Sequence, residues 1–258
     1  MSDRPLVQDI AAAIERYAPR DTAEEWDNVG LMLGDAKREC TGVVTALDCT
    51  LAVARQAKEE GCNLIVTHHP FIFRPLDRLT ADTAKGRTVE FLFANGISVY
   101  SAHTNLDKAE RGLNSVLAAR FGARGEVVHR GCGCFAEVDG QSAKELARRV
   151  ADVLGDPAVK VCAPDARVGK IYVVSGAGGG SEELAEAMLD ADALVTGEVR
   201  HHVYLDASES GFPVVEFSHY YSEKICCDVL KGMINSAFGG LKVVSARSEC
   251  PYKTLEEL

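Results

Sequence analysis

The stretch VVTALDCTLAVARQAKEEGCNLIV, residues 43–66, indicates how this chain folds. It opens with an apolar run at Val43–Leu47 and closes with a second apolar run at Asn63–Val66. Between them, residues 51–60 have a helical pattern that ends at Gly61. Short, continuous apolar runs are typical of strands buried on both faces, and parallel strands need a crossover such as this helix. The stretch therefore predicts a parallel β–α–β unit.

The same alternation continues on both sides of this stretch. Further helices are predicted over 6–17, 83–94, about 110–121, 142–154, from Ser181, between 196 and 213, and over 222–235. Further strands are predicted at 97–100, 158–162, 170–174, 192–196, 213–217 and 241–245. The order favours an α/β fold with two lobes, each a mostly parallel sheet flanked by helices.

The boundary between the lobes is expected in the stretch Gly122–Gly140, where glycines interrupt the periodicity. The first lobe would cover residues 1–125 and the second residues 126–258, with no long central insertion. After this stretch, Ser142 and Glu145 have the spacing of a capping box that begins a helix.

Composition narrows the possible functions. The 258 residues with 47% hydrophobic content are enough to form a sizeable core. The 28 basic and 38 acidic residues give a net charge of −10, which argues against nonspecific nucleic-acid binding because that needs Lys and Arg on phosphates. A nucleotide held in one local pocket stays possible.

The compartment is inferred from three further features. No signal-peptide pattern follows Met1–Pro5, and no apolar run is long enough to span a bilayer. The nine cysteines include no Cys-x-x-Cys pair, so we expect reduced thiols, several of them in the core. Together these features favour a cytoplasmic protein that does not bind membranes.

Histidines and carboxylates cluster in three short stretches, each at or beyond the end of a predicted strand. The stretches are Thr67-His68-His69-Pro70, His103-Thr104-Asn105-Leu106-Asp107 and His219-Tyr220-Tyr221-Ser222-Glu223. The carboxyl edge of a parallel sheet is where ligands bind. Imidazole and carboxylate suit zinc, iron, manganese or nickel, and the groups suffice for two divalent ions. The sequence therefore predicts a dinuclear metal site.

The spacing within these stretches agrees with that prediction. His219 and Glu223 are four residues apart, so a helix would place them on one face. Adjacent His68 and His69 diverge, so that each could serve one ion, and Asp107 or Glu223 could bridge the two. Alternatively, a His-His pair is structural or exposed, a single Asp is a turn residue, and a His-x-x-x-Glu spacing arises by chance.

The other histidines and the glycine-rich loop have weaker interpretations. His103 could orient a ligand or move a proton, or it could be a buried, hydrogen-bonded histidine. His129, His201 and His202 are interpreted as surface or structural residues, although His202 could approach a substrate. The loop Ser175–Gly180 lies between a predicted strand and a helix, where backbone N–H groups bind anions, but a tight turn is the favoured interpretation.

Over nearly its whole length the chain resembles the Nif-three-like dinuclear metal-binding proteins, also labelled GTP cyclohydrolase 1 type 2 homologs. Besides the three stretches above, the resemblance rests on Trp26–Gly30, Ser175–Gly180 and Thr196-Gly197-Glu198. Two departures are Ser218, where relatives usually have glycine, and Gly131-Cys132-Gly133-Cys134, where a glycine-arginine-glycine turn is expected.

The resemblance implies a site and an assembly. It implies two divalent ions in the cleft between the lobes and a ring-shaped homohexamer with the sites facing its interior. The implied ligands are His68, His69, Asp107, His219 and Glu223.

Three kinds of function remain open. The first is a metal-dependent hydrolase that opens the imidazole ring of GTP, with His103 or Glu198 assisting proton transfer, or a phosphoesterase or amidohydrolase at the same ions. The second is a non-catalytic hexamer that stores or delivers metal or has a regulatory role. The third is a structural α/β protein whose histidines are incidental.

Overall fold

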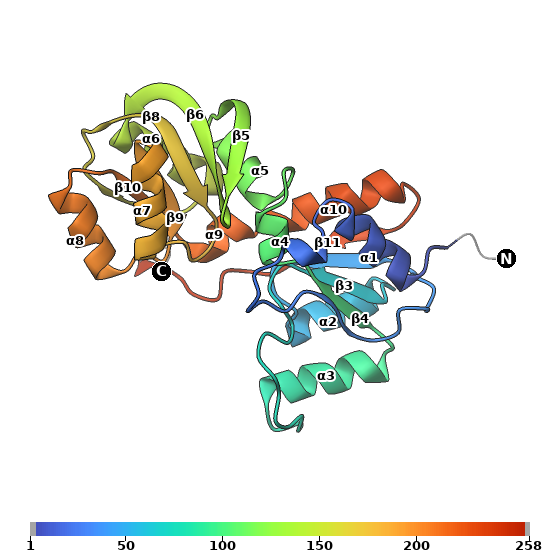
Figure 1. Ribbon diagram of the computed structural model, residues 1–258. Helices are drawn as coiled ribbons and strands as arrows, with labels where there is room; N and C mark the ends of the chain where they lie inside the picture. Colours follow the sequence, from blue (N-terminus) through green and yellow to red (C-terminus); the bar gives the residue numbers. More distant parts are fainter. Residues whose placement is uncertain (1–3, 256–258) are drawn as a thin grey trace. The chain divides into compact units, whose positions relative to one another are not determined.

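The structure, a computed structural model, describes residues 4–255 of the chain. It divides into two compact units (Figure 1). Unit 1 contains the chain up to Leu106 together with Lys224–Glu249, and unit 2 contains Asp107–Glu223 with the segment from Cys250 onward. Each unit has one sheet with helices packed against it, which confirms the α/β class.

Unit 1 is built on a five-stranded sheet. Its order is β1 (Gly30–Leu33), β4 (Ser98–Ser101), β3 (Leu64–Thr67), β2 (Val43–Ala46) and β11 (Val243–Ser245). All neighbours are parallel except β1, which pairs antiparallel with β4. Every residue of β2, β3 and β4 is buried, which explains why β2 and β3 are mostly apolar, whereas β4 has a buried serine at each end.

Helices cover both faces of this sheet. The helices α1 (Val7–Glu15) and α10 (Cys226–Ala237) pack together on one face, and α2 (Leu51–Glu59) and α3 (Ala84–Ala94) pack on the other (Figure 1). The side chain of Thr50 accepts a hydrogen bond from the backbone of Val53 and so caps α2. A 3₁₀ turn (Arg20–Thr22) lies between α1 and β1, and β2, α2 and β3 form the β–α–β unit predicted from residues 43–66.

Unit 2 is built on a six-stranded sheet. Its order is β5 (Arg124–Arg130), β6 (Gly133–Ser142), β8 (Arg167–Val174), β9 (Ala193–Gly197), β10 (Val214–Phe217) and β7 (Lys160–Cys162). The central strands β8, β9 and β10 are parallel, whereas β5, β6 and β7 pair antiparallel with their neighbours. This sheet is therefore mixed rather than mostly parallel.

The helices of unit 2 also pack on both faces of its sheet. On one face lie α5 (Leu113–Arg120) and α6 (Ala143–Leu154), and on the other lie α7 (Ser181–Asp190) and α8 (His201–Glu209) (Figure 1). The capping box of Ser142 and Glu145 begins α6, as predicted. The short helix α9 (His219–Glu223) follows β10 directly.

The division into units differs from the expected boundary after residue 125. The chain enters unit 2 within the short helix α4 (Thr104–Asp107), so Asp107 belongs to unit 2. The stretch Gly122–Gly140 contains the β5–β6 hairpin, whose turn uses Gly131 with φ +58°. Residues 224–249 return to unit 1 because α10 packs on α1 and β11 pairs with β2. Hydrophobic periodicity reports local burial and carries no information on such distant pairings.

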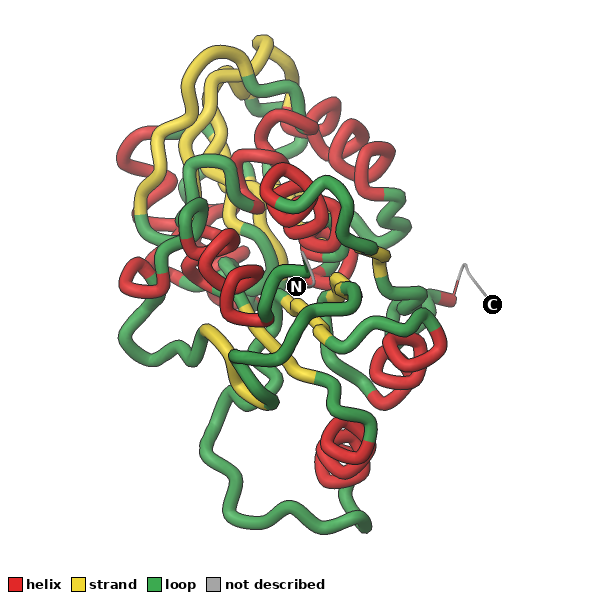
Figure 2. The backbone as a smooth tube through the Cα atoms, turned by 90° about the vertical axis from the view of Figure 1, so that its right-hand side faces the viewer, coloured by secondary structure: helices red, strands yellow, loops and turns green. Residues whose placement is uncertain are grey.

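Two other features bear on function. None of the helices within residues 4–255 has the length and apolarity needed to cross a membrane. The segment 68–83 between β3 and α3 contains neither helix nor strand, and Figure 2 shows it as a long green excursion next to that helix.

Candidate functional site

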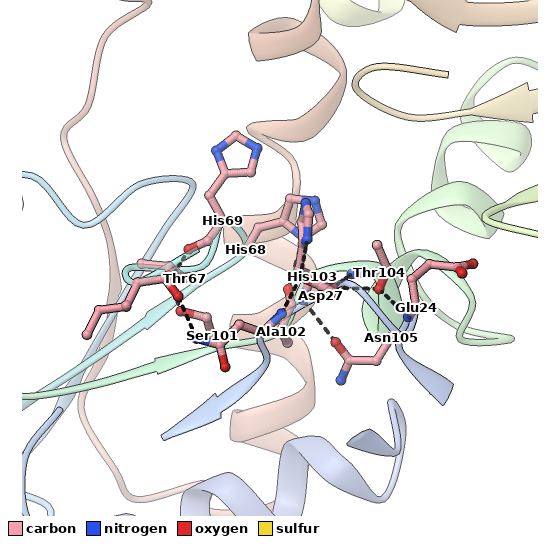
Figure 3. A network of polar contacts seen from close by, with 12 residues as sticks. Glu24, Asp27, Thr67, His68, His69, Ser101, Ala102, His103, Thr104 and Asn105 are labelled. Atoms are coloured by element: carbon pink, nitrogen blue, oxygen red, sulfur yellow. Dashed lines mark hydrogen bonds and ion pairs between the residues drawn. The ribbon is translucent and has the colours of Figure 1, made fainter. Parts of the chain in front are cut away.

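Three histidines of unit 1 lie at the carboxyl edge of its sheet. His68 and His69 follow β3 directly, and His103 comes two residues after β4 (Figure 3). Because β3 and β4 are parallel neighbours, their ends meet at the same edge. One ring nitrogen from each histidine lies within 4.8 Å of the other two. The three side chains thus form a group that could hold a metal ion.

The histidine pair is held by oxygen atoms on Nδ1. Nδ1 of His68 lies 3.0 Å from the carbonyl oxygen of Ala102, and Nδ1 of His69 lies 2.8 Å from Oδ1 of Asp48. A carbonyl or ionised carboxylate oxygen only accepts hydrogen bonds, so Nδ1 carries the proton in both rings. The lone pair is then on Nε2, and this is how metal-binding histidines are oriented in proteins.

His103 is held in the same way, by a buried carboxylate. Its Nδ1 lies 2.9 Å from Oδ1 of Asp27, whose other oxygen accepts hydrogen bonds from the backbone and hydroxyl of Thr104 (Figure 3). Burial raises the pKa of Asp27, but the hydrogen bonds from His103 and Thr104 more than offset it, and the pKa is lowered to about 2. Asp27 is therefore ionised at neutral pH. A carboxylate behind a histidine orients the ring and stabilises its positive charge during proton transfer.

Unit 2 carries a second group at the carboxyl edge of its own sheet. Ser175, Glu198 and His219 each follow one of the parallel strands β8, β9 and β10. Nδ1 of His219 lies 2.8 Å from Oε1 of Glu198, and its Nε2 lies 2.8 Å from Oε2 of Glu223. Helix α9 thus places His219 and Glu223 on one face, as the spacing of four predicted. Glu223 is 4% exposed.

The glycine-rich loop lies against these side chains. Gly176 has a left-handed backbone with φ +64°, and a Cβ there would overlap Oε1 of Glu223. The neighbouring Ser175 donates its hydroxyl hydrogen to Oδ1 of Asp107, at 3.0 Å. The loop is a turn that brings Asp107, which is buried, to the same part of unit 2 as His219 and Glu223. Glycine is required at 176 by both close approach and backbone angle.

Sequence reasoning assigned no role to two of the anchoring carboxylates, Asp27 and Asp48. Asp48 comes two residues after β2, which neighbours β3, so its position at the same sheet edge was a usable signal. Asp27 lies three residues before β1, and the antiparallel pairing of Gly30 with Ser101 at the end of β4 brings it to His103. Glu198, which is expected to assist proton transfer, contacts Nδ1 of His219.

The remaining histidines lie elsewhere in unit 2. Nε2 of His129 is 2.7 Å from the hydroxyl of Ser115, which ties β5 to α5, and burial lowers the pKa of His129. His201 and His202 are exposed at the start of α8, with Nε2 of His202 3.3 Å from the hydroxyl of Ser181. The structural interpretation of these residues agrees with their contacts.

Both sheets carry histidine and carboxylate side chains at their carboxyl edges, as the resemblance to the family implies. A comparison of the whole chain with protein families tests that resemblance. The model of the DUF34/NIF3 family (NGG1p interacting factor 3) matches residues 5–251. The chain belongs to this family. The match extends over both units, so the family resemblance is not limited to the histidine stretches.

Individual family members are similar over nearly their full length. The GTP cyclohydrolase 1 type 2 homolog of Clostridium acetobutylicum is 32% identical over 266 residues, which cover 96% of this chain and 98% of that protein. The GTP cyclohydrolase 1 type 2 of Helicobacter pylori is 29% identical over 219 residues, which cover 85% of this chain and 87% of that protein. The crystal structure of a Staphylococcus aureus hypothetical protein superposes with a TM-score of 0.90 at 28% identity, over 98% of this chain and 100% of that one.

Proposed function

We propose that this chain binds two divalent metal ions and is a metal-dependent hydrolase. The proposed ligands are His68, His69, Asp107, His219 and Glu223. One observation carries the proposal: Nδ1 of each ligand histidine contacts an oxygen acceptor, on Ala102, Asp48 or Glu198. Histidines with an incidental role have no reason to share this arrangement, whereas metal-binding histidines almost always have it.

The chemistry of the donor set fits a borderline divalent cation. Each unit offers imidazole nitrogen, and unit 2 adds two buried carboxylates, Asp107 and Glu223. Imidazole nitrogen and carboxylate oxygen together are the ligand types that such a cation accepts. When bound, two divalent ions would supply Lewis-acid polarisation and a water of lowered pKa.

The residues of the chain would have separate tasks in the reaction. Asp27 holds the ring of His103 in one tautomer, so Nε2 of His103 is the atom that would take and return a proton. Glu198 would orient His219 through Nδ1, and its expected part in proton transfer is proposed alongside this role. The metal group of unit 1 also includes His103, so a ligand role for it is a second outcome to be tested.

The proposed substrate is GTP, because a relative of 29% identity carries the name GTP cyclohydrolase 1 type 2. The reaction consumes two water molecules and breaks both bonds between C8 and the ring nitrogens of guanine. C8 leaves as formate, N7 gains two hydrogens to become an amine, N9 gains one, and formic acid releases the fourth as a proton, so no oxidant or reductant is needed. A general acid such as protonated His103 would assist departure of a ring nitrogen.

Metal binding is tested first, by elemental analysis of the chain after incubation with zinc, iron or manganese. We expect about two ions of one metal per chain, as the dinuclear arrangement requires. Glu223→Ala should lower this content while circular dichroism is unchanged, and the exposed Glu209→Ala serves as the matched control. A content near zero with all three metals would overturn the proposal.

Activity is tested second, on metal-loaded protein with GTP. We expect formate and a ring-opened product in equal amounts. Release of phosphate alone would replace the cyclohydrolase reaction by a phosphoesterase reaction at the same ions. Full metal content with no turnover of GTP, phosphoesters or amides would favour the non-catalytic metal-binding function.

A further inference from the structure

Two large aromatic side chains stand exposed next to His103. Trp26 is 52% exposed and Phe73 is 38% exposed, and both belong to unit 1. The ring centroids are 5.9 Å apart for Trp26 and Phe73, 6.2 Å for Trp26 and His103, and 6.1 Å for Phe73 and His103. These three rings, named here the aromatic corner, therefore contact one another pairwise.

The rings meet edge to face and are not stacked in parallel. The angles between their planes are 83° for Trp26 and Phe73, 76° for Trp26 and His103, and 84° for Phe73 and His103. Three nearly perpendicular planes form a corner, in which each contact is between an edge and a face. The exposed area of Trp26 and Phe73 is thus available to a flat molecule.

The aromatic corner is held in place by polar contacts. The side-chain amide of Asn28 donates to the carbonyl oxygen of Ile72 at 2.5 Å, which ties the loop of Trp26 to the loop of Phe73. The loop of Trp26 is further held by Asp27, through its bonds to His103 and Thr104. Trp26 and Phe73 lie on loops, and these hydrogen bonds hold the two loops in place. The rings are therefore preorganised, which lowers the entropy lost when a ligand binds.

A positive charge lies at the same place. The guanidinium carbon of Arg74 is 4.8 Å from the ring centroid of Phe73. Exposed aromatic rings with an adjacent cation fit a flat ring that carries an anionic substituent, since the rings stack on the flat part and the cation attracts the charge. A purely apolar partner would leave Arg74 and the hydrogen-bonding edge of His103 unused.

We infer that Trp26 and Phe73 form a stacking subsite for a planar heteroaromatic ring with an anionic substituent, as in a nucleotide. The inference rests on the proposed function in one respect, namely that the reacting position of the ring would then be next to His103. The subsite itself requires only the rings and Arg74. It gives a role to two large aromatic side chains that stay 52% and 38% exposed although they pack on each other and on His103.

The test uses the fluorescence of Trp26, which is the only tryptophan of the chain. Metal-loaded protein is titrated with GTP, with guanosine and with inorganic tripolyphosphate. We expect saturable quenching by GTP and guanosine and none by tripolyphosphate. Phe73→Leu keeps an apolar side chain without a ring and should weaken GTP binding by about 10-fold, the range of one stacked base. Phe93→Leu, which removes an exposed ring from α3, is the matched control and should leave the affinity unchanged.

Three outcomes would overturn the subsite. They are equal quenching by tripolyphosphate, an unchanged GTP affinity in Phe73→Leu, and an emission that depends on protein concentration but not on ligand, as expected of a contact between copies of the chain. Metal content and formate release are measured on the same samples. Quenching without metal or turnover would defeat the proposed function alone, and turnover without quenching would defeat the subsite alone.

Discussion

Oε1 of Glu198 lies 2.8 Å from Nδ1 of His219, and Glu198 reaches this position with a left-handed backbone of φ +54°. Among non-glycine residues of 4–255, only Ala163 shares a positive φ. Such a conformation destabilises a non-glycine residue by about 1–3 kcal/mol and is retained where the surroundings demand it. Here the backbone N–H of Val199 donates to the buried carboxylate of Glu216, at 3.1 Å, and holds the turn.

Replacing Glu198 by glycine should separate stability from metal binding. Glu198→Gly removes the backbone strain but adds the entropy cost of glycine and loses the contact with His219, so the free energy of unfolding of the metal-free protein should change by less than about 1 kcal/mol. The affinity for metal should fall by about 10–100-fold because His219 loses the acceptor on Nδ1. Competition with a chelator measures the affinity, and Ala163→Gly is the control for strain alone. An unchanged affinity would show that the Glu198 contact has no part in metal binding.

The close approach of Gly176 to Glu223 can be tested against a glycine with the same backbone angle. Gly176 and Gly211 both have φ +64°, but a Cβ at Gly211 meets no atom within 4 Å. Gly211→Ala should therefore destabilise the protein by about 1 kcal/mol through backbone strain alone. Gly176→Ala should destabilise it further and lower its metal content, as measured by thermal unfolding and elemental analysis. Equal unfolding temperatures for the two variants would contradict the close approach.

Glu216 is expected to support the turn at Glu198 from beneath. Its carboxylate accepts hydrogen bonds from Tyr204 at 2.7 Å, from Lys160 at 2.7 Å and from the backbone of Val199. Burial and the bond to Glu216 raise the pKa of Tyr204, which keeps its hydroxyl protonated as a donor. Glu216→Ala leaves two half-buried donors, the hydroxyl of Tyr204 and the N–H of Val199, without an acceptor and should lower the free energy of unfolding by about 2 kcal/mol.

The control for this prediction is Tyr204→Phe, which removes one donor together with its need for an acceptor. It should lower the free energy of unfolding by only about 1 kcal/mol. Denaturant titration measures both values. A smaller effect for Glu216→Ala than for Tyr204→Phe would mean that Glu216 does not hold the turn.

Asp27 predicts a specific dependence of stability on pH. Its pKa is lowered from 3.8 to about 2 in the folded protein, so the ionised form stabilises the fold at every pH above the unfolded value. This contribution, about 2 kcal/mol by linkage, should decline as the pH falls from 4 toward 2. The unfolding free energy of the wild type minus that of Asp27→Asn should therefore be constant at neutral pH and shrink in that acidic window. A difference that is independent of pH would contradict the assigned pKa.

The expected fold was confirmed where neighbours in sequence are neighbours in space. The buried strands β2 and β3 are recognisable as apolar runs, and the capping box of Ser142 and Glu145 begins a helix as predicted. The β5–β6 hairpin was not predicted. Strand β5 is mostly exposed and contains few apolar residues, and both strands contain glycine. The strand character of the hairpin comes from pairing with β8, which local propensity does not reveal.

For the candidate site, sequence determined which residue types follow which strands, because ligand chemistry and strand order are both written in local patterns. His68, His69, His103 and His219 are therefore recognisable as candidates from the order of residues alone. Tertiary structure alone decided which oxygen each histidine contacts through Nδ1, and that Asp27 and Glu198 are among these partners. It also decided that residues 224–249 return to the sheet of unit 1. The physical reason is the same in each case: these contacts join segments far apart in the chain, and only the packing of whole elements brings them together.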